Sequence, residues 1–361
     1  MPPAAAPPPL AYRPALNGLR AIAVWLVIVA HWTRAPFPLG EMGRLTFFVL
    51  SGYLISGIIW KQGVYAGAPG PWRQRLGTFY QRRLLRIIPP YYLALLLGWL
   101  LPLATLHEHL GWFLLPASNL LFYRLQHWGE GVGHYWTMAV EEQFYLVWPL
   151  LLGLLGRRTA WLGLLVGAGL AFRLAWSAWV GPGFVLVLLP ACLDLFALGA
   201  LLRLLEQHPR VQALARGRWV LLSWLVWVGL WVLTHTFEGH ALWLLAYPSV
   251  GGGAAFITLR WVLGLPADGR RGRLLLHPLL QWVGLRSYGC YLYHLLLVVF
   301  YQRAVYHVFA AADTRRLWMG PLPTLLLLTP LLLALAAASW AWLEEPLNRV
   351  KDRLAYAKQT N

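Results

Sequence analysis

Charge and cysteine are scarce in this chain of 361 residues. Only 12% of the residues are charged, about half the share usual in soluble domains. The two cysteines, Cys192 and Cys290, stand in apolar runs without the spacing of metal ligands, so we expect neither a disulfide nor a metal site. Residues 1–12 lack the charged start and apolar run of a signal peptide. We expect them to form a disordered cytoplasmic tail before a first apolar span that is retained.

Apolar and aromatic residues, by contrast, are abundant. The chain is 59% hydrophobic and contains 22 tryptophans and 16 tyrosines, which suit the aromatic belts at the two faces of a bilayer. The sequence predicts an all-α, polytopic membrane protein with about ten transmembrane helices and both termini on one side. The runs long enough to cross the hydrocarbon stand near 15–33, 43–61, 84–104, 139–156, 159–180, 189–206, 219–236, 242–264, 284–309 and 322–343.

The basic residues between these runs predict the orientation, because cytoplasmic loops carry an excess of lysine and arginine. One side of the predicted topology receives Arg13, Arg73, Arg75, Arg82, Arg83, Arg157, Arg158, Arg210, Arg216, Arg218, Arg270, Arg271, Arg273, Arg349, Lys351, Arg353 and Lys358. The opposite side receives Arg34, Arg124, Arg315 and Arg316. We therefore expect cytoplasmic termini in a multi-pass protein of the cytoplasmic membrane. The net charge of +17 is explained by this topology, and no nucleic-acid partner is needed.

The chain reads as one membrane domain. No internal repeat and no appended soluble domain is evident, so we expect a transmembrane domain over residues 13–348 and a basic cytoplasmic tail over 349–361. Residues 106–133 are only moderately apolar and are broken by Gly111 and Pro116. This stretch is interpreted as an extracytoplasmic re-entrant or interfacial segment.

The first span, NGLRAIAVWLVIVAHW, carries the clearest chemical signal. Arg20 and His31 are separated by about three helical turns, or about 16 Å along the axis, which puts both on one face. An ionisable side chain in a membrane helix usually faces the protein interior or a water-filled cavity. Two on one face, at two depths, suggest a line of chemistry across part of the membrane.

The next two spans offer polar residues with competing explanations. In the second, Gly52 and Gly57 favour close helix packing, whereas Ser51 and Tyr53 could line a polar path beside the first helix. In the third, the basic cluster anchors the helix against anionic lipid or holds phosphate groups through guanidinium forks. That cluster consists of Arg82, Arg83 and Arg86.

Acidic residues begin another apolar run in HYWTMAVEEQFYLVW. Glu141 and Tyr145 share a helical face, and Glu142 is turned by about 100° from it. One explanation is that carboxylates favour the positive end of a helix, but a single acid would be enough for that. The alternative is a functional role for these carboxylates, shared with Trp136 and Thr137. Later in the chain, Asp194 is expected to pair with a buried arginine. His294 is either a second polar residue of the site or a packing histidine, and Glu344 precedes Pro346 where the last helix meets the cytoplasm.

The order of these motifs resembles the acyltransferase-3 family of integral membrane O-acyltransferases, from about Arg13 to Arg349. The chain matches six elements of the family in order. They are an arginine and a histidine with ten residues between them, a phenylalanine-rich serine–glycine–aromatic signature, paired arginines with a third before a proline, a tryptophan-to-glutamate stretch, a tyrosine–leucine–x–histidine, and a closing glutamate before proline. The residues that carry them are Arg20, His31, Phe47, Phe48, Ser51, Gly52, Tyr53, Arg82, Arg83, Arg86, Pro89, Trp136, Glu141, Glu142, Phe144, Tyr145, Pro149, Tyr291, Leu292, His294, Glu344 and Pro346. Thr137 and Met138 replace the usual serine and leucine, and Glu345 replaces a basic residue.

The resemblance implies an acyl transfer from cytoplasmic acyl-coenzyme A, with acetyl as the acyl group, to a sugar hydroxyl of an envelope glycan or lipid-linked saccharide. Arg82, Arg83 and Arg86 would hold the phosphates, with Arg20 nearer the thioester. His31 would act as general base or carry the acyl group, and Glu141 would orient its imidazole. No permanently bound cofactor is expected. Acyl-coenzyme A is the expected co-substrate, and membrane lipid is an expected partner.

Two alternatives remain open from the sequence. A secondary transporter or flippase could use Arg20, His31 and Glu141 as a relay. The sequence shows no inverted repeat of the kind common in transporters, which argues against this alternative. A non-catalytic acyl-glycan sensor or assembly partner is the other, and it leaves the alignment of Arg20 with His31 unexplained.

Overall fold

The computed structural model describes residues 12–65, 68–181, 183–236 and 241–356. This part of the chain is built of helices and contains no strand, so the predicted all-α class is confirmed. The long helices are α1 (Ala15–Thr33), α2 (Leu39–Gln62), α3 (Trp72–Leu100), α7 (Tyr135–Leu155), α8 (Thr159–Trp179), α9 (Leu189–Leu205), α11 (Gly217–Thr236), α12 (Ala241–Leu263), α15 (Ser287–Val308) and α17 (Pro321–Ser339). Each of them overlaps one of the predicted spans.

Not every long helix is apolar enough to count as a membrane span. Within the described residues, six helices meet the criteria of length and hydropathy: α1, α2, α7, α8, α11 and the continuous Pro321–Arg353 segment. A seventh span is possible if α14 (Pro278–Leu285) and α15, which meet at 74°, form one broken crossing. Leu221, Leu225 and Val226 on α11 are exposed, as expected for side chains that face lipid. The chain is a multi-pass membrane protein.

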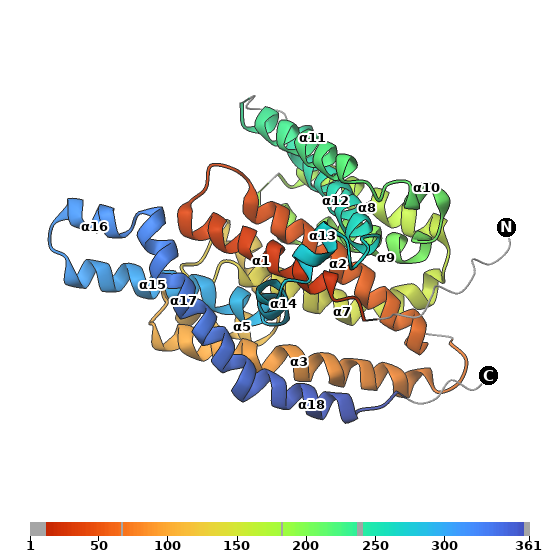
Figure 1. The fold of residues 1–361 in the computed structure, drawn as a ribbon, viewed down its shortest axis with the longest axis horizontal. Coiled ribbons are helices and arrows are strands. Elements are labelled where there is room, and N and C mark those ends of the chain that lie inside the picture. Colours follow the sequence, from red (N-terminus) through yellow and green to blue (C-terminus); the bar gives the residue numbers. More distant parts are fainter. Residues whose placement is uncertain (1–11, 66–67, 182, 237–240, 357–361) are drawn as a thin grey trace.

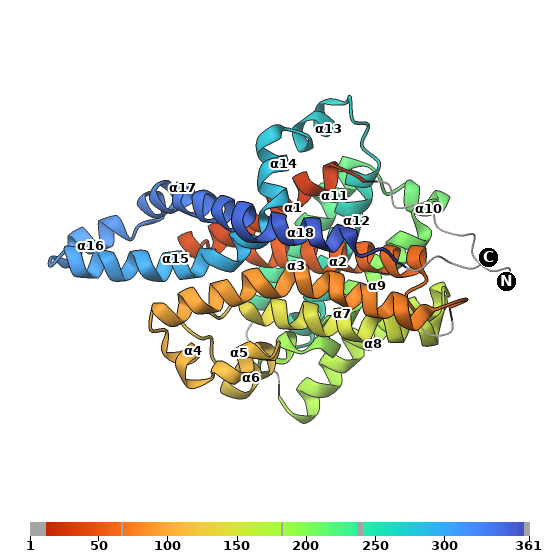
Figure 2. The same cartoon turned by 90° about the horizontal axis from the view of Figure 1, so that it is seen from below.

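Helices α1 and α2 lie at the centre of the molecule. Figure 1 shows α3 along one side of them, with α18 (Glu345–Arg353) beside it, and α11 and α12 on the other side. The hairpin of α15 and α17, closed by α16 (Ala312–Trp318), projects from this body in both views (Figures 1 and 2). The residues that connect α12 to α15 form α13 (Arg270–Leu275) and α14.

Glycine allows α2 and α9 to approach closely. A Cβ atom on Gly52 would lie 2.1 Å from the Phe196 carbonyl oxygen, and one on Gly199 would lie 2.0 Å from the Val49 carbonyl oxygen. Both distances are far below van der Waals contact, so these positions need glycine. The packing interpretation of Gly52 is therefore correct, while the neighbouring Ser51 turns its hydroxyl to another helix.

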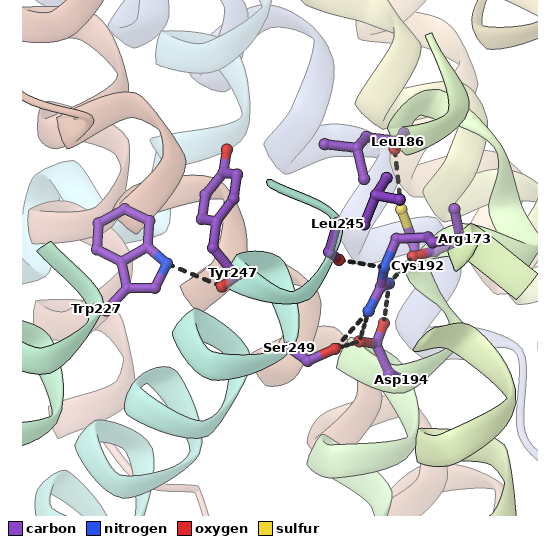
Figure 3. A network of polar contacts seen from close by, with 9 residues as sticks. Arg173, Leu186, Cys192, Asp194, Trp227, Leu245, Tyr247 and Ser249 are labelled. Carbon is purple, nitrogen blue, oxygen red and sulfur yellow. Dashed lines mark hydrogen bonds and ion pairs between the residues drawn. The ribbon is translucent and has the colours of Figure 1, made fainter. Parts of the chain in front are cut away.

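Asp194 was predicted to pair with a buried arginine, and that arginine is Arg173. Asp194 on α9 and Arg173 on α8 are fully buried and form a bidentate ion pair with nitrogen–oxygen distances of 2.7 and 3.1 Å (Figure 3). From α12, the Leu245 carbonyl accepts a bond of 2.9 Å from Arg173, and the Ser249 hydroxyl donates one of 2.6 Å to Asp194. The pair thus holds three helices together. Cys192 and Cys290 are both buried free thiols.

The stretch predicted to be re-entrant or interfacial folds into short helices. These are α4 (Ala104–Glu108), α5 (Leu110–Leu114) and α6 (Ser118–Leu125), at the lower edge of Figure 2. Tyr91 and Tyr92 of α3 donate hydrogen bonds of 2.9 Å to the carbonyls of Phe113 and Leu114. The segment is therefore tethered to α3 and does not form a separate span.

The last helix does not stop at Pro346, which corrects the sequence interpretation. After α17, residues Trp340–Glu344 form a π-helical segment, and α18 continues to Arg353 with Pro346 in its first turn. Proline is tolerated there because the first amide groups of a helix have no helical partner. Residues 349–353, expected to belong to a basic tail, are helical and lie beside α3.

Candidate active site

A cavity of about 690 Å³ opens between α1, α2, α3, α7, α15 and the C-terminal helical segment. Its volume falls within the range of about 300–1,000 Å³ that is typical of ligand pockets. We call it the arginine chamber. The predicted site residues that line it are Arg20, Ser51, Tyr53, Arg83, Arg86, Thr137, Glu141, Tyr145 and Glu344. The fold therefore gathers most of the predicted polar residues around one space.

Three of the predicted arginines line the chamber. Arg20 of α1 donates a hydrogen bond of 3.2 Å to the Ser287 hydroxyl at the start of α15. The guanidinium of Arg83 on α3 lies 5.5 Å from the ring centre of Tyr145, within the range of a cation–π contact. Arg86 follows one turn later on α3 and lines the same wall. Such groups suit bidentate binding of phosphate oxygens.

Arg82 does not join this cluster. Its guanidinium points toward the C-terminal segment, where it donates bonds of 2.7 Å to the carbonyls of Lys351 and Leu354 and pairs with Asp352 at 3.3 Å. The predicted arginine trio is thus divided between two sets of contacts. Arg83 and Arg86 face the chamber, and Arg82 fastens the end of α18.

Glu141 belongs to the chamber wall. Its carboxylate accepts hydrogen bonds from the Ser51 hydroxyl at 3.0 Å and from the Tyr145 hydroxyl at 3.2 Å. Among the hydrogen bonds of the described residues, none joins Glu141 to His31. The expected support of the His31 imidazole by this carboxylate is therefore absent from this arrangement.

The other predicted lining residues vary in position. Glu344 accepts a bond of 3.1 Å from the Ser339 hydroxyl at the chamber edge. Trp136 is buried behind the wall and packs edge-on against Phe48, with ring centres 6.2 Å apart. Glu142 is half-buried on another face of α7 and does not line the chamber.

Four charged residues that line the chamber were not among the predicted site residues: Arg13, Arg44, Lys351 and Asp352. Arg44 of α2 is buried, forms an ion pair with Glu41, and lies 5.3 Å from the ring centre of Trp136. An arginine inside the predicted span 43–61 was itself a signal of an interior position. Lys351 lines the chamber from the C-terminal helical segment. It was missed because its segment was predicted to be a tail.

His31 opens into a different space. A second cavity of about 480 Å³ lies at the other end of α1, against α15, α16 and α17, and we call it the histidine cavity. Its lining residues are His31, Trp32, Thr33, Arg34, Val298, Gln302, Tyr306, Ala312, Arg315, Arg316, Met319, Pro321 and Thr324. As the helical spacing predicted, Arg20 and His31 both face α15, where they meet Ser287 and His294.

The contact between His31 and His294 defines which ring nitrogens carry protons. Nδ1 of His294 lies 2.7 Å from the Tyr291 carbonyl oxygen. A carbonyl only accepts, so Nδ1 of His294 donates this bond. Because a lone charge is costly at a fully buried position, His294 is neutral and its Nε2 is an acceptor. His31 Nδ1, at 2.9 Å from that Nε2, is then the donor, which leaves Nε2 of His31 as its basic nitrogen.

A thin layer of side chains separates the two cavities, which share no lining residue in the described part of the chain. The hydroxyls of Thr137 and Tyr291 lie 2.6 Å apart at the inner end of the arginine chamber. Tyr291 also donates a bond of 3.1 Å to the His134 carbonyl. The ring of His134 packs edge-on against His294, with centres 4.7 Å apart. These contacts connect the wall of the chamber to the two paired histidines.

The fold and the two cavities define a helical, multi-pass membrane protein with a cationic chamber and a separate histidine site on one helix face. The chain belongs to the acyltransferase-3 family: the family profile, described as an acyltransferase domain, matches residues 13–341. The family predicted from the order of the motifs is thereby confirmed.

Curated relatives carry related names. The chain is 32% identical over 164 residues to "Putative O-acetyltransferase SAS0844" of Staphylococcus aureus strain MSSA476, covering 39% of this chain and 25% of that protein. It is 31% identical over 160 residues to O-acetyltransferase OatA of Staphylococcus aureus strain NCTC 8325, covering 41% of this chain and 26% of that protein. The matches thus span about a quarter of the length of these relatives. No solved structure matches the chain.

Proposed function

We propose that this protein is an O-acyltransferase that moves an acetyl group from acetyl-coenzyme A to a hydroxyl of an envelope glycan or other lipid-linked saccharide. One observation carries the proposal. A cationic cavity and a histidine cavity lie along one face of α1, at the positions of Arg20 and His31, in a member of an acyltransferase family.

The proposed topology has ten transmembrane helices, cytoplasmic termini and a site in the cytoplasmic membrane. The transmembrane domain would comprise residues 13–348, between a tail at 1–12 and a basic end at 349–361. Two contacts support it, because they join segments predicted for the cytoplasmic side. Arg13 pairs with Glu206 at 3.1 Å, and Arg157 donates a bond of 2.9 Å to the Trp60 carbonyl. The arginine chamber then opens toward the cytoplasm and the histidine cavity toward the outside.

On the donor side, Arg83 and Arg86 bind the phosphates of coenzyme A, and Arg20 lies deeper, toward the thioester. The pantetheine arm extends between α2 and α7, along Ser51 and Tyr145. Glu141 holds the hydroxyls of both residues, so it fixes the polar wall beside the thioester. The chamber thus supplies charge at its mouth and oriented hydroxyl groups farther in.

On the acceptor side, His31 is the general base. Its Nε2 takes the proton of the acceptor hydroxyl while the alkoxide oxygen forms an ester bond with the acyl carbon. The carbon–sulfur bond of the thioester breaks, and the proton passes from His31 to the departing thiolate, which leaves as coenzyme A. The acyl group reaches His31 when the Thr137–Tyr291 contact opens.

The test uses purified protein in detergent with radiolabelled acetyl-coenzyme A. We expect the native chain to release coenzyme A or retain label, and His31→Ala to lose this activity by about 10²–10⁴-fold, the usual contribution of a general base. Donor binding should survive in the variant. His307→Ala is the matched control, because this exposed histidine near the end of α15 does not line the histidine cavity.

Absence of donor binding and of coenzyme A release in both proteins would refute the acyltransferase proposal and favour the transporter. Equal activity in the native chain and His31→Ala would remove His31 from the chemical step.

A further inference from the structure

The histidine cavity contains a concentration of positive charge that the topology does not explain. Cationic loop residues are expected on the cytoplasmic side, yet Arg34, Arg315 and Arg316 line this one cavity on the opposite side. Arg124, the remaining arginine predicted for that side, lies on α6 and outside the cavity. Three of the four arginines predicted for this side therefore line the cavity that contains His31.

The backbone holds Arg34 in an unfavourable conformation. Arg34 caps the C-terminus of α1 with φ of 50°, in the left-handed region. Glycine is the usual residue at such a helix end, and other residues incur backbone strain there. An arginine in this place brings a cation to the rim of the cavity, three residues beyond His31, at a cost to the fold.

The other two arginines come from α16 at the tip of the projecting hairpin (Figures 1 and 2). Arg315 is supported by a cation–π contact with Tyr306, at 5.1 Å from the ring centre. Arg316 has Asp313 at 3.9 Å, but both side chains are more than four-fifths exposed, so this ion pair is weak. No carboxylate belongs to the described lining of the cavity. The positive charge there is not neutralised by the cavity's own side chains.

We propose that the histidine cavity binds an anionic saccharide, one that carries a phosphoryl or carboxylate group beside the hydroxyl that accepts the acyl group. This inference rests on the proposed function, because it takes the cavity as the acceptor site. Arg34, Arg315 and Arg316 bind the oxyanion, and His31 faces the hydroxyl. A neutral saccharide would leave the cationic lining of the cavity without an anionic ligand.

Ligand-observed NMR titrations of the full chain in detergent test the proposal with matched sugar pairs. N-acetylglucosamine 1-phosphate is compared with N-acetylglucosamine, and glucuronic acid with glucose. We expect the anionic member of at least one pair to bind about tenfold more tightly, since hydrogen bonds to charged groups contribute about 1.5–3 kcal/mol. Preference for the phosphate identifies a phosphorylated or lipid-diphosphate saccharide, and preference for the uronic acid identifies an acidic sugar residue.

Variants assign the preference to this cavity. The double variant R315Q/R316Q and the single variant Arg34→Gly should each reduce it, and the glycine also relieves the strain at φ of 50°, so folding is preserved. Arg124→Gln is the matched control and should leave the preference unchanged. Equal binding of charged and neutral sugars, lack of binding by either, or a preference that survives both cavity variants would overturn the proposal.

Binding of coenzyme A to the same preparations separates this inference from the proposed function. Donor binding without any preference for an anionic sugar refutes the inference alone. A preference that depends on the cavity arginines, without binding of coenzyme A, supports an anion site here and refutes the acyltransferase proposal.

Discussion

His294 is predicted to be a positioning residue for His31, and this prediction can be worked out from the structure. Replacing it by leucine removes the acceptor of the 2.9 Å bond that holds His31 Nδ1. A neutral hydrogen bond contributes about 0.5–1.5 kcal/mol, and 1.36 kcal/mol corresponds to a tenfold change in rate. We therefore expect kcat to fall by up to about tenfold in His294→Leu.

The variant His294→Gln distinguishes a positioning role of His294 from a packing role. Its side-chain amide can accept a bond from His31 through the oxygen and donate one through the nitrogen, as the two nitrogens of His294 do. The variant His294→Gln should therefore retain most of the activity that His294→Leu loses. Neither substitution should change the affinity for acetyl-coenzyme A, because His294 does not line the arginine chamber.

The assay is the rate of coenzyme A release at saturating donor, with donor affinity measured separately on the same samples. An unchanged kcat in His294→Leu would show that the histidine contact has no part in catalysis. If the leucine and glutamine variants lost rate and donor affinity together, His294 would be a packing residue whose loss disturbs the whole site.

Two further predictions concern the donor site and the fold. Arg83→Gln should weaken binding of acetyl-coenzyme A about tenfold. Arg82→Gln should weaken binding less and should expose the C-terminal helix to added protease. Equal effects of the two variants on binding would contradict the different contacts of the two arginines. Arg173→Leu should destabilise the protein by about 3–5 kcal/mol, because it leaves the buried Asp194 carboxylate without its cation. Adding Asp194→Leu should recover much of that loss in thermal unfolding in detergent, and a double variant as unstable as the sum of the two single variants would refute the coupling.

The helical framework could be predicted because hydrophobic length is encoded locally. The first span was predicted at 15–33 and is observed at Ala15–Thr33, and the partner of Asp194 was expected to be a buried arginine. Such predictions can be made from single segments, because an apolar run is recognised from its own sequence without information on the segments that pack against it. The exception is α3, which begins at Trp72 instead of near 84, because its first turns are basic and amphipathic.

The division of the site could not be predicted from the same patterns. Arg82 and Arg83 are adjacent in the sequence, and their opposite roles depend on the C-terminal segment that packs against α3. That segment was expected to be a tail, because a proline and a run of charges usually end a helix. Helix α18 supplies Lys351 to the chamber and a backbone carbonyl to Arg82. Because this helix was not predicted, the positions of Lys351 and Arg82 were not predicted either.

The distance between Arg20 and His31 explains why two cavities are needed. At about 1.5 Å per residue, the two side chains lie too far apart for one small group to contact both, and Val24, buried between them, fills the intervening face of α1. In the proposed mechanism, the helix separates the binding of a large anionic donor from the proton transfer at the acceptor. His294 and Tyr291 lie one turn apart on α15, so the same turn of helix contacts His31, the proposed base, and Thr137 of the chamber wall. An opening of the Thr137–Tyr291 contact would thus bring the acyl group to the side of the layer on which His31 is already oriented.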